Sequence, residues 1–79
     1  MITTSRYASK ETKDEAKKIA QKRAEKYIAR GKKTIEKIVE SARRSGEHKV
    51  LILEEKNNKP LKLSILQIDE LGRWKWISN

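Results

Sequence analysis

The architecture of this chain depends on the run Lys49-Val50-Leu51-Ile52-Leu53-Glu54, which holds its longest unbroken stretch of apolar residues. The branched side chains of this run favour an extended strand. Successive residues of a strand point to opposite faces of a sheet, so four consecutive apolar residues indicate burial on both faces. The run therefore predicts a central strand.

Two further strands are predicted downstream of this run. Residues 56–59 supply an asparagine turn, since asparagine tolerates positive φ. Residues 60–68 first alternate between apolar and polar and then change phase at Leu66, which indicates either a bulge or a second buried face. After a turn at residues 69–72, the alternation of residues 73–77 predicts a final strand.

The first third of the chain predicts a short strand and a helix. Met1–Arg6 is rich in β-branched residues, which favour a strand. Ser9 or Thr12 can cap the helix that follows, whose apolar stripe is narrow and made largely of alanine. The segment Tyr27–Ala29 fits either the end of this helix or a short strand of its own.

A second helix is predicted after Gly31, because the apolar residues from Ile35 to Ala42 form one stripe at helical spacing. Gly46 stands where a helix commonly ends. The expected order is β-α-(β)-α-β-β-β, an α/β fold with two helices packed on a small mixed sheet. A length of 79 residues allows one small domain, so residues 1–79 are expected to form a single domain.

The composition excludes several kinds of protein. The chain has no Cys and one His, which excludes disulfides, thiol catalysis, thiolate zinc sites and a His-rich metal cluster. No apolar run is long enough to span a membrane, and the N-terminus lacks the long apolar core of a signal peptide. We therefore expect a soluble, cytoplasmic protein without metal or cofactor.

The charge of the chain favours a polyanionic partner. Its 20 Lys and Arg against 11 Asp and Glu give a net charge of +9, and residues 1–45 hold 14 of the basic and 6 of the acidic side chains. Each phosphate neutralised by Lys or Arg releases counterions, which makes nucleic acid the default partner of such a chain. A solvated helix face rich in Lys and Glu is the alternative, but the net excess favours the polyanion.

Several segments resemble archaeal Brix-domain proteins of ribosome biogenesis. The resemblance rests on the opening Ile2-Thr3-Thr4-Ser5-Arg6 and on Arg30-Gly31-Lys32-Lys33-Thr34, which leads into residues 35–46. The strand 50–53, its asparagine turn and the strand from Pro60 follow in the family's order. The Brix domain has two similar halves, each like the anticodon-binding domain of some aminoacyl-tRNA synthetases. The resemblance implies that this chain corresponds to the N-terminal half.

The first candidate site lies around Gly31, which precedes a helix whose first amides point outward. Two lysines flank those amides, which makes a workable phosphate site, and the resemblance implies that the opening strand ends near it. The alternative is that the lysines are only solvated. Two arginines in the last turn of the second helix are further candidates for nucleic-acid contact. The full set of candidates is Arg6, Arg30, Gly31, Lys32, Lys33, Arg43 and Arg44.

Trp74 and Trp76 project to the same face of the last strand. An exposed tryptophan face would be a stacking platform for unpaired bases, whereas a covered one would be core or dimer contact. We favour core or dimer contact, because Trp is the largest apolar side chain of the sequence. Two helices, one with a thin apolar stripe, must cover both sheet faces, so we also expect a homodimer paired through this strand. The resemblance implies that such a dimer would imitate the two halves of a Brix domain.

These observations favour an RNA-binding module of ribosome assembly, with ribosomal RNA as partner and assembly proteins as further partners. A nucleoid-type DNA-binding protein and a protein–protein adapter that docks through its sheet edge are the alternatives. His48 has no partner pattern, and adjacent strand residues such as Glu54 and Glu55 face opposite ways. No catalytic motif occurs, so we do not expect an enzyme.

Overall fold

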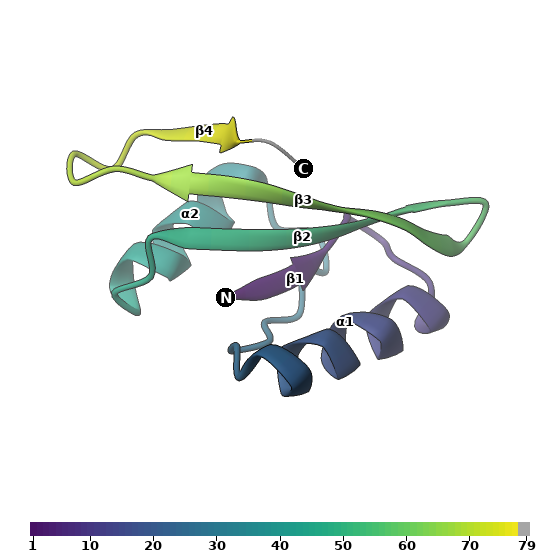
Figure 1. Ribbon diagram of the computed structural model, residues 1–79. Coiled ribbons are helices and arrows are strands. Elements are labelled where there is room, and N and C mark those ends of the chain that lie inside the picture. Colours follow the sequence, from purple (N-terminus) through teal and green to yellow (C-terminus); the bar gives the residue numbers. More distant parts are fainter. Residues whose placement is uncertain (78–79) are drawn as a thin grey trace.

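The computed structural model describes residues 1–77 (Figure 1). Its elements follow in the order β1 (Ile2–Thr4), α1 (Lys10–Arg23), α2 (Ile35–Arg44), β2 (Lys49–Lys56), β3 (Lys59–Ile68) and β4 (Trp74–Ile77). The strands form one sheet in the order β1-β2-β3-β4, in which β1 is parallel to β2 and the other neighbours are antiparallel. This arrangement confirms the α/β fold class and the element order expected from the sequence.

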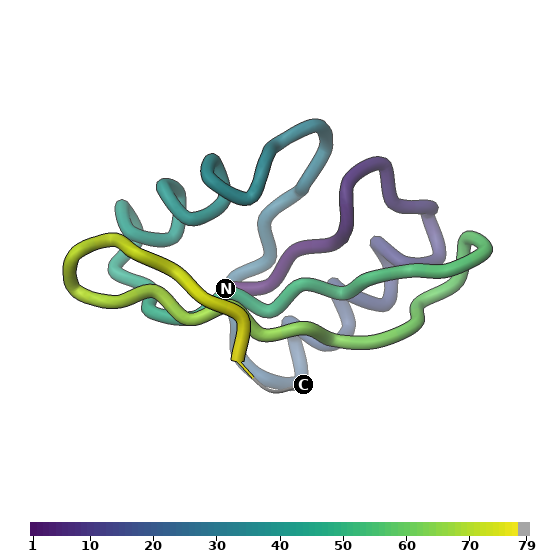
Figure 2. Tube along the Cα trace, turned by 90° about the horizontal axis from the view of Figure 1, so that it is seen from above, coloured from purple at the N-terminus to yellow at the C-terminus, as the bar shows by residue number. Residues whose placement is uncertain are grey.

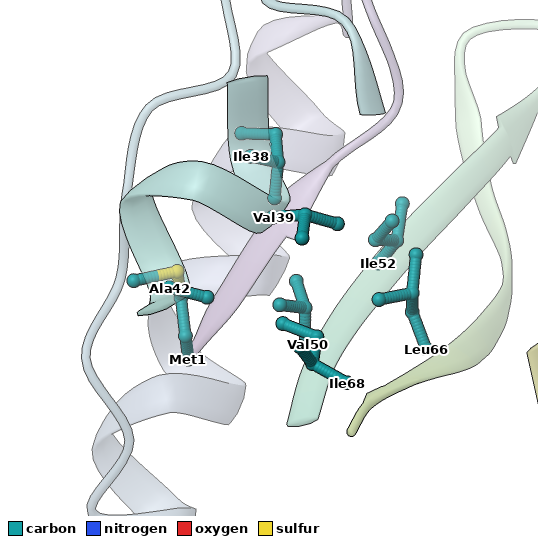
Figure 3. Close-up of a cluster of buried hydrophobic side chains, with 8 residues drawn as sticks. All are labelled: Met1, Ile38, Val39, Ala42, Val50, Ile52, Leu66 and Ile68. Atoms are coloured by element: carbon teal, nitrogen blue, oxygen red, sulfur yellow. The ribbon is translucent and has the colours of Figure 1, made fainter. Parts of the chain in front are cut away.

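The predicted central strand is β2, which lies between β1 and β3. Val50 and Ile52 belong to a cluster with α2, whereas Leu51 and Leu53 belong to a second cluster with α1. The two helices therefore lie on opposite faces of the sheet, with α2 behind the sheet and α1 below it in Figure 1. Figure 3 shows the α2 cluster, which consists of Met1, Ile38, Val39, Ala42, Val50, Ile52, Leu66 and Ile68.

The phase change in β3 reflects a second buried face. Leu66 and Ile68 point into the α2 cluster, whereas Leu63 and Ile65 are half-buried against the α1 cluster. The other alternative, a bulge, does not occur at this phase change. The bulge between β2 and β3 lies instead between Glu54 and Glu55, where the register of the two strands shifts.

The segment after α1 behaves as a short strand and not as the end of the helix. Tyr27 forms an isolated parallel bridge with Ile2. The backbone N–H of Ile2 donates to the carbonyl of Lys26 at 2.8 Å, and that of Ile28 donates to the carbonyl of Ile2 at 2.9 Å. These bonds pair the outer edge of β1, so the first strand has neighbours on both sides.

The helices begin and end at residues whose chemistry explains the boundary. Ser9 caps α1 by accepting from the backbone N–H of Thr12, and Thr12 itself lies inside the helix. Thr34 caps α2 in the same way. Gly46, with φ of 73°, follows the end of α2 as expected, whereas α1 ends at Ala24 with φ of 54°. A residue with a Cβ occupies this left-handed conformation less readily than glycine does.

Candidate nucleic-acid interface

Two loops meet at the carboxyl end of β1: residues 5–9, which lead into α1, and residues 29–34, which lead into α2 (Figure 2). The backbone N–H of Tyr7 donates to the carbonyl of Gly31 at 3.4 Å. The structure thereby brings Arg6 beside the segment Arg30–Lys33, although the two are far apart in the sequence.

Arg30 is buried, with 6% of its surface exposed, and it holds the two loops together. Its Nη1 donates to the carbonyl of Thr4 at 2.9 Å and its Nε donates to the carbonyl of Lys33 at 2.6 Å. Burial lowers the pKa of the guanidinium, and the positive charge of Arg6 lowers it further. The role that the structure displays for Arg30 is to position the loop, and its contact with a phosphate stays a prediction.

The exposed cations of this group are Arg6, Lys32 and Lys33. The backbone N–H of Lys33 donates to the carbonyl of Arg30 at 3.0 Å, which closes a turn around Gly31. Gly31 has φ of 54°, and nothing lies within 4 Å of the place where a Cβ would stand. Backbone conformation, and not close packing, therefore favours glycine here. Lys32 and Lys33 belong to this turn, and Arg6 belongs to the neighbouring loop that Tyr7 joins to it.

Tyr7 belongs to this site, and sequence reasoning missed it. Its side chain is 68% exposed, and the guanidinium carbon of Arg6 lies 5.5 Å from the ring centroid. Its φ is 55°, an uncommon value for a bulky residue. An aromatic residue next to a candidate phosphate-binding arginine was a usable signal, but the left-handed backbone was not readable from the sequence.

Arg43 and Arg44 lie at the other end of α2. A helix of 10 residues is about 15 Å long, so these arginines do not join the first group. Arg44 pairs with Glu40 at 2.6 Å, and the guanidinium of Arg43 lies against Gly72, 2.5 Å from where a Cβ would stand. The structure therefore divides the predicted contacts into two separate groups.

The two helices also divide the charge of the first half of the chain. They pack on opposite faces of the sheet, so the excess of positive charge in residues 1–45 is spread around the molecule. At the two loops, exposed cations from different segments lie close together.

The two tryptophans share a face, as predicted, but differ in exposure. Trp74 pairs with Ile68 and packs partly buried against the α2 cluster, whereas Trp76 pairs with Leu66 and is 49% exposed. Their rings meet edge to face at 6.1 Å. Trp76 lines a shallow groove with Glu54, Lys62 and Ser64. Trp74 is therefore a core contact, while Trp76 remains free for stacking or for a dimer.

The adjacent strand residues Glu54 and Glu55 take part in structural contacts. The carboxylate of Glu55 accepts from the backbone N–H of Ser9 at 2.8 Å and from the hydroxyl of Thr12 at 3.2 Å. Glu54 accepts from the hydroxyl of Ser64. Across residues 1–77 no group of three or more His, Cys, Asp or Glu side chains could hold a metal ion. Neither helix of this part of the chain combines the length and the apolar character needed to cross a membrane.

Comparison with known proteins identifies a structural class. No family model matches this sequence, and no curated protein matches it closely enough to count as a relative. Several solved structures share its fold, and two of them agree with the resemblance seen in the sequence. The chain has the architecture of a half-domain found in archaeal ribosome-biogenesis proteins of the Brix type.

One of these structures is Mil, an archaeal Imp4-like protein, which is 26% identical with a TM-score of 0.76 over 84% of this chain. The other is a probable ribosomal biogenesis protein from Aeropyrum pernix K1, which is 20% identical with a TM-score of 0.84 over 96% of this chain. The chain spans 42% and 43% of the lengths of these two proteins. The resemblance to the Brix family is thus confirmed at the level of the fold.

Proposed function

We propose that this chain acts in ribosome biogenesis by binding RNA, and ribosomal RNA in particular. The observation that carries the proposal is the meeting of Arg6, Lys32 and Lys33 at two adjoining loops, on a fold shared with a probable ribosomal biogenesis protein. Binding, and not catalysis, is the proposed activity, since the sequence has no catalytic motif.

The chemistry of the three side chains suits backbone phosphates. The guanidinium of Arg6 can bind two phosphate oxygens at once, while Lys32 and Lys33 act as point charges. In the free protein the ammonium of Lys33 donates to the carbonyl of Ala29 at 3.0 Å. Arg30 positions the loop that carries the two lysines, because it donates hydrogen bonds to the carbonyls of Thr4 and Lys33. Contacts of this kind fix position on the RNA without reading its sequence.

The test removes the three charges together. In the variant Arg6→Gln/Lys32→Gln/Lys33→Gln, each lost phosphate contact should flatten the slope of log affinity against log salt by about 0.7 on single-stranded RNA, or about 2 in total. A control variant, Lys18→Gln/Lys22→Gln/Lys49→Gln, removes three exposed charges elsewhere and should keep the wild-type slope. Titrations with ribosomal RNA fragments, single strands and duplex DNA measure both.

The results separate the competing functions. Tighter binding to RNA than to duplex DNA supports the proposal, whereas the reverse order supports a nucleoid protein. Equal loss in the two triple variants would mean that only overall charge matters and would overturn the site.

Self-association through β4 is a second proposal, favoured by the position of that strand. Within residues 1–77, β4 pairs on one side only, with β3, and Trp76 on it is half-exposed. Pairing two copies across a two-fold axis would cover both features. Sedimentation equilibrium at micromolar concentration tests it. A single-chain mass throughout, with tryptophan fluorescence unchanged on dilution, would exclude the dimer.

A further inference from the structure

We propose that Tyr7, together with Arg6, forms a stacking site for one unpaired base of RNA, beside the phosphate contacts of Lys32 and Lys33. This inference rests on the proposed function and makes it more specific, because it names single-stranded RNA as the ligand of the site. It concerns a residue that lies between the first strand and the first helix and has no role in the core.

The backbone of Tyr7 is unusual. Its φ of 55° lies in the left-handed region, which glycine and asparagine occupy most readily. Elsewhere among residues 1–77 positive φ is found at glycine and asparagine, and at Ala24, whose side chain is much smaller than that of tyrosine. A tyrosine in this conformation is strained, and strain of this kind points to a functional role when packing does not explain it.

Packing does not explain the conformation of Tyr7. Its side chain is 68% exposed, so the ring gains little from burial. The other tyrosine provides an internal comparison, because Tyr27 is half-buried against the α1 cluster and has the ammonium of Lys17 5.7 Å from its ring centroid. Tyr27 contributes to the fold, whereas Tyr7 presents its ring to solvent.

The groups around the Tyr7 ring suit a nucleic-acid base. The guanidinium carbon of Arg6 lies 5.5 Å from the centroid of the Tyr7 ring, and the backbone N–H of Tyr7 donates to the carbonyl of Gly31. Aromatic rings and arginine planes are the surfaces on which proteins stack splayed-out RNA bases. Here such a surface adjoins cations that can hold the flanking phosphates.

This geometry selects single strands over duplexes. Both faces of a base within a duplex are covered by its neighbours, so only an unpaired base can lie on Tyr7. Exposed cations by themselves bind any polyanion. The ring therefore converts a general phosphate site into one for loops, bulges or ends.

The experiment measures stacking separately from charge. The probe is a short single-stranded RNA carrying one 2-aminopurine, whose fluorescence falls when the base stacks. Tyr7→Leu should weaken binding about 5- to 100-fold, the range expected for one base on an aromatic ring, and should leave the salt slope unchanged because no charge is lost. Tyr7→Trp should preserve both the affinity and the quenching.

Two further variants protect the result against an effect on folding. Tyr7→Gly suits the left-handed backbone and should fold at least as well as the parent, yet it should bind as weakly as Tyr7→Leu. Leu71→Ala removes another highly exposed apolar side chain, on the β3–β4 turn, and should bind as the parent does.

The outcomes distinguish this inference from the function on which it rests. If Tyr7→Leu and Tyr7→Gly bind the RNA as the parent does while the Arg6/Lys32/Lys33 variant loses its salt slope, stacking is wrong and phosphate binding stands. If all of these variants behave as the parent does, both proposals fail. Equal affinity of the parent for the single strand and for the matching RNA duplex would also overturn the stacking site.

Discussion

The two helices cover the faces of the sheet with apolar clusters of different size. Within residues 1–77 the α2 face has eight buried apolar residues in its cluster, several of them branched, whereas the α1 face has five, including Ala16 and Ala20. Alanine allows close approach but buries little area. Half-buried apolar residues flank both clusters, with Ile19, Tyr27, Leu63 and Ile65 on the α1 side and Ile28, Ile35 and Trp74 on the α2 side.

Polar contacts at the end of α1 compensate for its thin apolar face. The carboxylate of Glu55, on β2, accepts hydrogen bonds from the first residues of this helix. The hydroxyl of Ser9 donates to the carbonyl of Asn58 in the hairpin turn at 2.9 Å. A small chain can thus attach one helix by a larger apolar cluster and the other by a smaller apolar cluster supplemented by hydrogen bonds at its capping residues.

The largest effect on the free energy of unfolding is expected from a substitution in the apolar cluster of α2. Ile38 is fully buried on α2, so Ile38→Ala should cost about 3–4 kcal/mol through lost burial and a residual cavity. Ile19 is only half-buried on α1, so Ile19→Ala should cost only about 1 kcal/mol. Urea denaturation of the two variants measures both values. Equal losses would mean that the two faces contribute equally and would contradict the comparison.

The elements of the packed α2 side could be predicted from the sequence better than the polar contacts between distant segments. The run 49–54 and the helical stripe from Ile35 to Ala42 carry their periodicity in the sequence, so the central strand and α2 could be read directly. The contacts of Glu55 and Arg30 join segments more than twenty residues apart, and no local pattern reveals such a pairing. For the same reason the site was predicted in part: its cations were recognised, but the burial of Arg30 and the exposed ring of Tyr7 follow from the tertiary fold.

A smaller effect concerns the charge that links the two sides. The ammonium of Met1 donates to Glu25, just after α1, at 2.5 Å, and to Glu47, just after α2, at 2.8 Å. Burial opposes the charge, but the hydrogen bonds and negative charges of the two carboxylates outweigh it, so the pKa of the ammonium is raised above its ordinary value of 8.0. The hydrogen bond from the ammonium lowers the pKa of Glu47 below 4.5.

These shifts predict a plateau of stability. A raised ammonium pKa stabilises the fold below pH 8.0 and this contribution is lost as the pH rises through the shifted value, whereas the lowered pKa of Glu47 stabilises it above pH 4.5 and is lost in acid. The free energy of unfolding should therefore decline as the pH rises from 8.0 through the raised pKa of the ammonium. Glu25→Gln/Glu47→Gln should remove most of that decline. An unchanged profile in the double variant would show that the ammonium does not link the two sides.

The smallest effect compares the ends of the two helices. α2 is followed by Gly46 and α1 by Ala24, and both residues have left-handed backbones, with φ of 73° and 54°. Because a Cβ disfavours this conformation, Ala24→Gly should stabilise the protein by about 0.5–1 kcal/mol, and Gly46→Ala should destabilise it by about 1 kcal/mol. Nothing lies within 4 Å of the position of a Cβ at Gly46, so the second change tests conformation free of any clash. Thermal denaturation of both variants measures the two shifts, which should be opposite in sign. A loss of stability in Ala24→Gly would mean that the methyl group of Ala24 contributes more to the weakly packed α1 side than its backbone strain costs.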